Sequence, residues 1–204
     1  VKVNGRSVEA DGSYTIAAMD QSYCVVVVFE AIPLTPVVLF DNDFEDAVFP
    51  GRGWSVKGID NTPKYGTWKQ YKYYYFNGTQ NAYVADDWMG NKDQDEYLIS
   101  PAVDLTGSES RVLTFDYAYG YYNVKDGTYQ GTVEVSTDGG ATWTAIWNIK
   151  DTLPDKQTGN VVTGTAEISV AEEYAVNGVQ FAFHYVHKGG DNTGIFAVDN
   201  VTLK

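Results

Sequence analysis

The sequence of 204 residues is poor in cysteine, methionine, histidine and positive charge, and each scarcity excludes a class of protein. Its one cysteine, Cys24, rules out an intramolecular disulfide framework and a cysteine-rich zinc site. Cys24 lies in the apolar run 23–29, so we expect it to be a small buried hydrophobic residue. Because many exported bacterial proteins lack disulfides, the cysteine count leaves the compartment open.

Basic residues are outnumbered by acidic ones, 14 against 27, which gives a formal net charge of −13 at pH 7. Phosphate backbones and anionic lipid need clustered lysine and arginine, so nucleic acid is excluded as a partner. No run of 18 or more apolar residues is present, and we expect no membrane insertion. The chain begins at Val1 without a signal peptide, which favours a piece of a larger multidomain protein.

Aromatic residues are abundant, with 16 Tyr, 9 Phe and 5 Trp, and 20 Gly supply turns. This mixture favours strands, and the clearest alternation of apolar and polar residues runs over 112–119. A short helix is expected only around 170–174. The chain is therefore predicted to be an all-β, two-sheet sandwich, with strands at 37–40, 67–76, 82–85, 97–100, 111–119, 131–136, 142–149, 163–169, 179–186 and 195–203.

The N-terminal segment has an organisation of its own. Asn4-Gly5 and Asp11-Gly12 between apolar residues predict tight hairpins, but the strands before residue 31 make too small a core to fold alone. Pro33 and Pro36 follow and favour an extended linker. We therefore divide the chain into 1–34, the tail of an immunoglobulin-like repeat or a set of docked hairpins, and 35–204, the main domain.

Catalytic signatures are few. The two histidines, His184 and His187, are three residues apart on a predicted strand, so they point to opposite faces of the sheet and do not chelate one metal. Glycoside hydrolysis needs only two carboxylates, and the 27 acidic residues leave it formally open, yet no local signature supports it. We expect no enzyme activity.

The segment from Ser136 to Trp143 has the form Ser-x-Asp-x-Gly-x-Thr-Trp, which resembles the Asp-box of secreted β proteins. We expect a hairpin in which Asp138 accepts hydrogen bonds from turn amides, Gly140 supplies positive φ and Trp143 packs beneath. The motif is therefore interpreted as architecture and not as catalysis. A single copy argues against a propeller.

Acidic clusters are candidates for calcium. Asp41, Asp43 and Glu45 alternate along a predicted extended segment, which places three carboxylates on one side, and hard oxygens suit Ca²⁺. The acidic residues at 86–87 and 93–96 form two further clusters. None has the spacing of an EF-hand loop, and a solvated acidic edge is the alternative for each.

Aromatic side chains are candidates for ligand binding, because exposed tyrosine and tryptophan stack on sugar rings or on a protein partner. Most of them alternate along strands and are expected in the core or in cross-strand pairs. Trp88, Tyr121 and Tyr122 lie at the ends of loops and are the better ligand candidates.

Several segments, taken in order, resemble the cleaved-adhesin domains of gingipains and haemagglutinins and the choice-of-anchor J domains of secreted Bacteroidetes proteins, relatives of MAM domains. The resemblance covers the chain from about residue 37 to its end. It rests on FDNDFE at 40–45, GW at 53–54, QDEYLISP at 94–101, LTFDY at 113–117, VEVS at 133–136, VQFAF at 179–183 and GIFAVDNVTL at 194–203.

The resemblance implies a jelly-roll sandwich of the galactose-binding-like or MAM-like kind, a secreted or cell-surface bacterial address and a glycan or host matrix protein as ligand. It also implies a structural Ca²⁺ where the first and last strands meet, held by Glu45 and Asp199 with Asp43 as the nearest added carboxylate. The expected function is an extracellular adhesion or carbohydrate-binding module. The alternatives are an ancillary substrate-binding domain of a secreted hydrolase and a purely structural spacer.

Overall fold

The structure is a computed structural model, in which the chain divides into two compact units, Val1–Thr35 and Pro36–Lys204. It describes residues 2–3, 6–7, 25–26, 37–59, 67–72, 76, 79–85, 93–108, 110–156, 159–188 and 194–204. Cys24, Trp88 and the Asp11-Gly12 turn lie outside the described residues.

The described part of the first unit is an antiparallel sheet of order β2-β1-β3. Its strands are β1 (Lys2–Val3), β2 (Arg6–Ser7) and β3 (Val25–Val26). The pairing of β1 with β2 is the pairing that a hairpin turn at residues 4–5 predicts. The origin of this unit in an immunoglobulin-like repeat stays a prediction.

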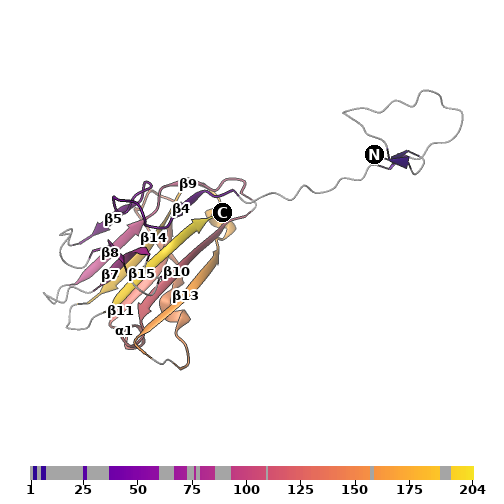
Figure 1. Ribbon diagram of the computed structural model, residues 1–204. Coiled ribbons are helices and arrows are strands. Elements are labelled where there is room, and N and C mark those ends of the chain that lie inside the picture. Colours follow the sequence, from indigo (N-terminus) through magenta and orange to yellow (C-terminus); the bar gives the residue numbers. More distant parts are fainter. Residues whose placement is uncertain are drawn as a thin grey trace, which may run out of the picture. The chain divides into compact units, whose positions relative to one another are not determined.

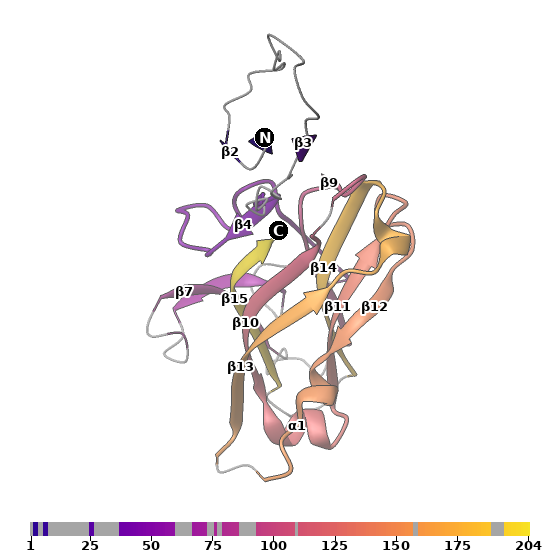
Figure 2. The same ribbon diagram turned by 90° about the vertical axis from the view of Figure 1, so that its right-hand side faces the viewer.

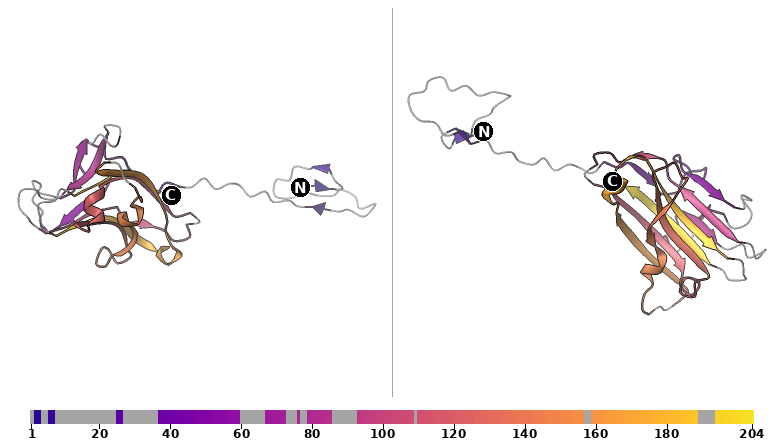
Figure 3. Two further views of the ribbon diagram at one scale, coloured as in Figure 1. Left: turned by 90° about the horizontal axis from the view of Figure 1, so that it is seen from below. Right: turned by 180° about the vertical axis from the view of Figure 1, so that it is seen from behind.

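The second unit is a sandwich of two antiparallel sheets, as the alternating sequence pattern predicts (Figure 1). We call them the β10 sheet, of order β13-β10-β15-β7-β6 with β4 also paired to β15, and the β14 sheet, of order β12-β11-β14-β8-β5 with β9 also paired to β14. Figure 2 shows β13, β10 and β15 in one layer and β14, β11 and β12 in the other. Figure 3 shows the ribbon in two further views.

The strands of the β10 sheet are β4 (Phe40–Asn42), β6 (Lys69–Lys72), β7 (Gln80–Ala85), β10 (Val112–Gly120), β13 (Val161–Ser169) and β15 (Ile195–Leu203). Those of the β14 sheet are β5 (Ser55–Gly58), β8 (Gln94–Ile99), β9 (Val103–Asp104), β11 (Tyr129–Ser136), β12 (Thr144–Asn148) and β14 (Asn177–His187). The alternation predicted over 112–119 is confirmed in β10, where Leu113 and Phe115 are buried and Asp116 is half-buried on the outer face.

Helical segments are short. α1 (Tyr121–Lys125) follows β10, and two 3₁₀ turns, η2 (Ile149–Thr152) and η3 (Glu172–Tyr174), follow β12 and β13. The prediction of a helix only around 170–174 is therefore wrong at α1. The single turn of α1 is followed by Gly127, whose left-handed backbone has φ of 74°. No described helix combines the length and the apolar character that a crossing of the membrane requires.

Aromatic rings fill the space between the two sheets. The Phe183 ring of β14 lies 4.9 Å from the Phe115 ring of β10, 6.1 Å from Trp54 and 6.5 Å from the Phe196 ring of β15, all between centroids. Each such pair contributes about 0.5–1.5 kcal/mol beyond the burial of its area. These rings therefore pack into one aromatic cluster that contacts strands of both sheets.

The Asp-box forms the β11–β12 hairpin, as predicted. Asp138 Oδ1 accepts hydrogen bonds from the backbone N–H groups of Ala141 (3.0 Å) and Thr142 (2.9 Å) and from Ser136 Oγ (2.8 Å). The hydrogen bond from the Thr142 hydroxyl to Oδ2, together with these bonds to Oδ1, lowers the pKa of Asp138 to about 2. Gly140 has φ of 81°, the left-handed backbone that the motif predicts for its turn.

His184 is an interstrand bridge on the outer face of the β14 sheet. Its Nδ1 lies 2.8 Å from Glu134 Oε1 and its Nε2 lies 2.7 Å from Asp95 Oδ1, and the Tyr97 ring stacks on the imidazole at 3.8 Å between centroids. Burial alone would lower the pKa of His184, but the hydrogen bonds and charges of both carboxylates outweigh it and raise that pKa. The imidazole therefore links β8, β14 and β11.

Replacing His184 by glutamine (His184→Gln) removes the positive charge and keeps a polar side chain. We expect the free energy of unfolding to fall by about 1.5–3 kcal/mol at pH 6, because hydrogen bonds to charged groups contribute about that much. The raised pKa makes this contribution complete below the ordinary value of 6.5, and it is lost as pH rises through the folded-state pKa. Urea unfolding of both proteins at pH 6 and pH 9 measures the change.

His187→Gln is the matched control, since His187 is the other histidine, lies on the same strand and is buried. Burial lowers the pKa of His187, so folding disfavours its charged form and the parent protein loses stability as pH falls. The difference in the free energy of unfolding between the parent and His187→Gln should therefore become smaller as pH falls, whereas the difference for His184→Gln should become larger. An equal loss for His184→Gln at both pH values would contradict the ion-pair interpretation.

Candidate functional site

Glu45 is placed by a turn that follows β4. Asn42 Oδ1 accepts a hydrogen bond from the Phe44 N–H at 2.9 Å, and Phe44 adopts left-handed backbone with φ of 53°. The turn buries the Phe44 ring against Trp54, at 5.9 Å between centroids. Glu45 then reaches the beginning of β7, where its Oε1 accepts a hydrogen bond from the Gln80 N–H at 2.6 Å.

Asp199 lies opposite this turn on β15, between the two stretches of that strand that pair with β7 and with β4. Its carboxylate is buried and accepts hydrogen bonds from the Asn200 N–H at 2.8 Å and from Thr79 Oγ1 at 3.2 Å. Burial, with the nearby charges of Asp116 and Glu45, raises the pKa of Asp199 to about 6. No basic side chain contacts this carboxylate within the described residues.

Glu45 and Asp199 are therefore brought together, as the resemblance implies, from positions far apart in the sequence. They meet at the connection that enters β7, where Thr79 and Gln80 are neighbours in the chain (Figure 2 shows β4 and β7 beside β15). A buried carboxylate beside a second acid destabilises the folded protein unless a positive charge compensates it, and a hard cation bound by both acids would do so. Glu45, Asp199, the Thr79 hydroxyl and the Phe76 carbonyl oxygen, which accepts from that hydroxyl at 2.6 Å, are the oxygens available.

Asp43, the third residue of the predicted calcium site, pairs with a basic side chain and not with Glu45 or Asp199. Arg52 donates to Asp43 Oδ1 at 2.8 Å, to Asp41 Oδ2 at 2.5 Å and to Asp46 Oδ2 at 3.2 Å. The expected row is found for Asp41 and Asp43, which share Arg52. Glu45 also lies outside the core, but after the left-handed Phe44 its carboxylate turns to the Gln80 N–H. In the part of the chain that the structure describes, no three acidic, histidine or cysteine side chains are grouped to hold a metal. A cation at Glu45 and Asp199 would thus need backbone, hydroxyl and water oxygens for its remaining ligands.

Of the three predicted ligand residues, the structure describes Tyr121 and Tyr122. Tyr121 is buried and carries Lys125 Nζ 5.7 Å above its ring, so it packs within α1 and the core. Tyr122 is 50% exposed, and its ring lies 5.1 Å from that of Tyr121 in an edge-on arrangement. A role in binding stays a prediction for Tyr122 and for Trp88.

A hollow of about 210 Å³ lies beside α1 without including either tyrosine. Residues from α1, β11, β12 and η2 surround it: Val124, Gly127, Tyr129, Gln130, Asn148, Ile149 and Lys150. The sequence analysis made no binding-site prediction for these residues.

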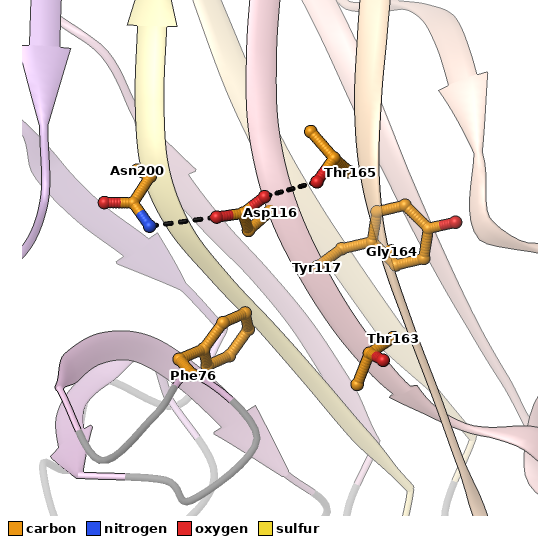
Figure 4. A pocket seen from close by; sticks show the side chains of 7 residues that line it. All are labelled: Phe76, Asp116, Tyr117, Thr163, Gly164, Thr165 and Asn200. Atoms are coloured by element: carbon orange, nitrogen blue, oxygen red, sulfur yellow. Dashed lines mark hydrogen bonds between the residues drawn. The ribbon is translucent and has the colours of Figure 1, made fainter.

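A second hollow, of about 230 Å³, lies on the outer face of the β10 sheet (Figure 4). Its lining comes from the segment before β7 and from β10, β13 and β15: Phe76, Asp116, Tyr117, Thr163, Gly164, Thr165 and Asn200. Asp116 accepts hydrogen bonds from Thr165 Oγ1 at 2.6 Å and from Asn200 Nδ2 at 2.9 Å. The sequence analysis missed this hollow, although Asp116 occupies an outward position of the best alternating strand.

Asp116 and Asp199 are direct cross-strand partners in β10 and β15. Between this pair and the next one, Thr114 with Thr202, a β-bulge gives β15 one extra residue. Asn200 lies in this bulge and has left-handed backbone with φ of 50°. The bulge therefore lets Asp199 face Thr79 while the next side chain, Asn200, reaches Asp116. The candidate cation site and the hollow adjoin each other along β15.

No family model matches this chain, and no curated protein matches it. Solved structures do. The K1 cleaved adhesin domain of Lys-gingipain from Porphyromonas gingivalis is 20% identical, with a TM-score of 0.53 over 81% of this chain and 96% of that one. The K3 cleaved adhesin domain of the same protein is 16% identical, with a TM-score of 0.54 over 82% and 99%.

A third similar structure is the module CBM27-1 of Caldicellulosiruptor saccharolyticus, solved in complex with mannohexaose. It is 15% identical, with a TM-score of 0.51 over 84% of this chain and 97% of that one. At these identities the likeness concerns the fold. The second unit of this chain has the β-sandwich fold shared by cleaved adhesin domains and carbohydrate-binding modules, as the ordered motifs of the sequence predict.

Proposed function

We propose that this chain is an extracellular adhesion or carbohydrate-binding module of a bacterial surface or secreted protein, non-catalytic and stabilised by a structural calcium ion. One observation carries the metal: the buried Asp199 carboxylate lies beside Glu45 with no basic partner within the described residues. Its raised pKa, caused first by burial, is the signature of an acid whose charge lacks compensation. Ca²⁺ would supply that charge and tie the β4 turn to β15.

Support for binding comes from the outer face of the β10 sheet and from the fold. Rigid strands hold Asp116, Asn200 and two threonines around the second hollow, and a site on strands is more precise than a site on loops. The module CBM27-1, with the same fold, was solved with mannohexaose. The Lys-gingipain domains are adhesin domains. A glycan is therefore the ligand class that we propose. A purely structural spacer, the alternative function, would not require the hollow.

Glycoside hydrolysis is the second candidate, because Asp116 and Asp199 are opposite each other and the pKa of Asp199 is raised to about 6 by burial. A retaining hydrolase uses two carboxyl groups about 5–5.5 Å apart, one of them protonated. Asp199, however, is buried, does not line the hollow and has its two oxygens hydrogen-bonded to the Asn200 N–H and to Thr79 Oγ1. An acid in that position does not reach a glycosidic oxygen above Asp116, which favours binding.

Thermal unfolding in EDTA and in millimolar Ca²⁺ tests the metal. Saturation at about a hundred times Kd stabilises by about 2.7 kcal/mol, which for a chain of this length raises Tm by roughly 5–10 °C. We expect Asp199→Asn and Glu45→Gln to abolish this shift. In EDTA, Asp199→Asn should melt no lower than the parent, because the amide spares the buried site an uncompensated charge.

Asp43→Asn is the matched control, since Asp43 belongs to the same turn and faces Arg52. This variant should keep the full calcium shift. Absence of a shift in the parent protein would overturn the calcium proposal, and so would a shift that survives Asp199→Asn.

Incubation with neutral oligosaccharides separates binding from hydrolysis. We expect saturable binding in calorimetry and no shortened products by chromatography after a day at pH 5 and pH 7. Because Asp199 would be the acid, hydrolysis that is faster at pH 5 and lost in Asp199→Asn would establish the second candidate in place of the first.

A further inference from the structure

The hollow on the β10 sheet is built around a carboxylate held in one position. Asp116 Oδ1 accepts from Thr165 Oγ1 on one neighbouring strand, and Oδ2 accepts from Asn200 Nδ2 on the other (Figure 4). A carboxylate has about four lone-pair sites, so each oxygen keeps one for a further donor. The two neighbours thus fix the orientation of the acceptor without using it up.

An aromatic ring forms a wall of the same hollow. Phe76 packs on Ala118 of β10 and Ala197 of β15, and Tyr83 and Val161 pack against this group. The two alanines are direct cross-strand partners, and their small side chains let the ring lie close to the sheet. Figure 4 shows the Phe76 ring below the hydrogen-bonded row of Asn200, Asp116 and Thr165. The hollow therefore offers an apolar wall on one side and oriented polar groups on the other.

Tyrosines extend the apolar surface along the sheet. The Tyr83 ring of β7 lies 5.0 Å from the Tyr71 ring of β6 at 31°, with Lys69 Nζ 5.7 Å from the centre of the Tyr83 ring. Tyr83 is the cross-strand partner of Ala197, and Tyr71 is 45% exposed. A chain molecule with one unit in the hollow can continue across β15 and β7 toward these rings.

The negative charge at the hollow further restricts the class of ligand that it can bind. The hollow presents the Asp116 carboxylate, Asp199 is its cross-strand partner, and the chain carries a formal charge of −13. An anionic ligand would be repelled at short range, whereas a ligand rich in neutral O–H donors completes the open lone pairs of Asp116. The Thr165 hydroxyl donates to Asp116 and can still accept, and the Thr163 hydroxyl can donate or accept, which suits the hydroxyl groups of a sugar.

From this combination we infer that the hollow binds one sugar unit of an uncharged oligosaccharide, with two of its hydroxyl groups on Asp116 and its apolar C–H groups against the part of Phe76 that lines the hollow. The volume of about 230 Å³ is below the range of drug-sized pockets and suits a single sugar ring. This inference rests on the proposed carbohydrate-binding function and names its site and ligand class. Asp116 and Phe76 take the place of the tyrosines at α1 as the principal contacts.

The test is calorimetry of the full chain with mannohexaose, cellohexaose and xylohexaose, and with trigalacturonic acid as the anionic probe. For the neutral hexasaccharide that binds best, Asp116→Ala should weaken binding at least tenfold, since it removes two charge-assisted hydrogen bonds. Thr163→Phe should abolish binding by filling the hollow. Thr163 is exposed on the sheet surface, so this change leaves the core intact.

Glu167→Ala is the matched control, because Glu167 is an exposed acid on the outer face of the same strand as Thr163 and does not line the hollow. It should bind like the parent protein. A melting curve for each variant in calcium confirms that the domain is folded.

The outcomes separate this inference from the proposed function. Binding of a neutral hexasaccharide that survives both Asp116→Ala and Thr163→Phe overturns the site and leaves carbohydrate binding in place. Preference for trigalacturonic acid over every neutral hexasaccharide overturns the ligand class. No binding of any sugar overturns the carbohydrate-binding function and this inference together, while the calcium shift stands or falls separately.

Discussion

The last strand, β15, is the element on which the rest of the second unit depends. One edge of β15 pairs with β10, and the other pairs with β7 and then with β4. Phe196, Val198, Val201 and Leu203 send their side chains into the core from this strand. A segment at the very end of the chain therefore joins the first strand of the unit to its centre. Such non-local pairing is costly in chain entropy, and the core contacts of β15 offset that cost.

Much of the sandwich could be predicted from the sequence, because a strand with one buried face alternates. The pattern at 112–119 corresponds to β10 and the pattern at 195–203 to β15. The beginning of the unit was less predictable. The apolar run 37–40 reads as a strand, yet pairing with β15 starts at Phe40, since register depends on the partner and not on composition.

The candidate site was predictable only in part, and the reason is electrostatic. Asp43 and Glu45 look equivalent in the sequence, but Arg52 neutralises Asp43 whereas Glu45 turns toward Asp199. Which acid meets a base and which meets another acid depends on one left-handed residue, Phe44. A bulky residue at positive φ is uncommon, and no pattern of apolar and polar letters announces it. Asp116 was likewise visible as an outward position, but its partners Thr165 and Asn200 belong to strands distant in sequence.

The bulge in β15 makes two consecutive side chains, Asp199 and Asn200, serve the same outer face, which strict alternation forbids. Asparagine tolerates the left-handed backbone that the bulge requires, and β-branched residues do not. The cation candidate and the hollow are thus joined by a single peptide unit, so they cannot diversify independently in evolution. A change of residue 200 that removed the bulge would shift Asp199 as well, whereas changes on β10, on β13 or at Phe76 would alter the hollow without moving Asp199.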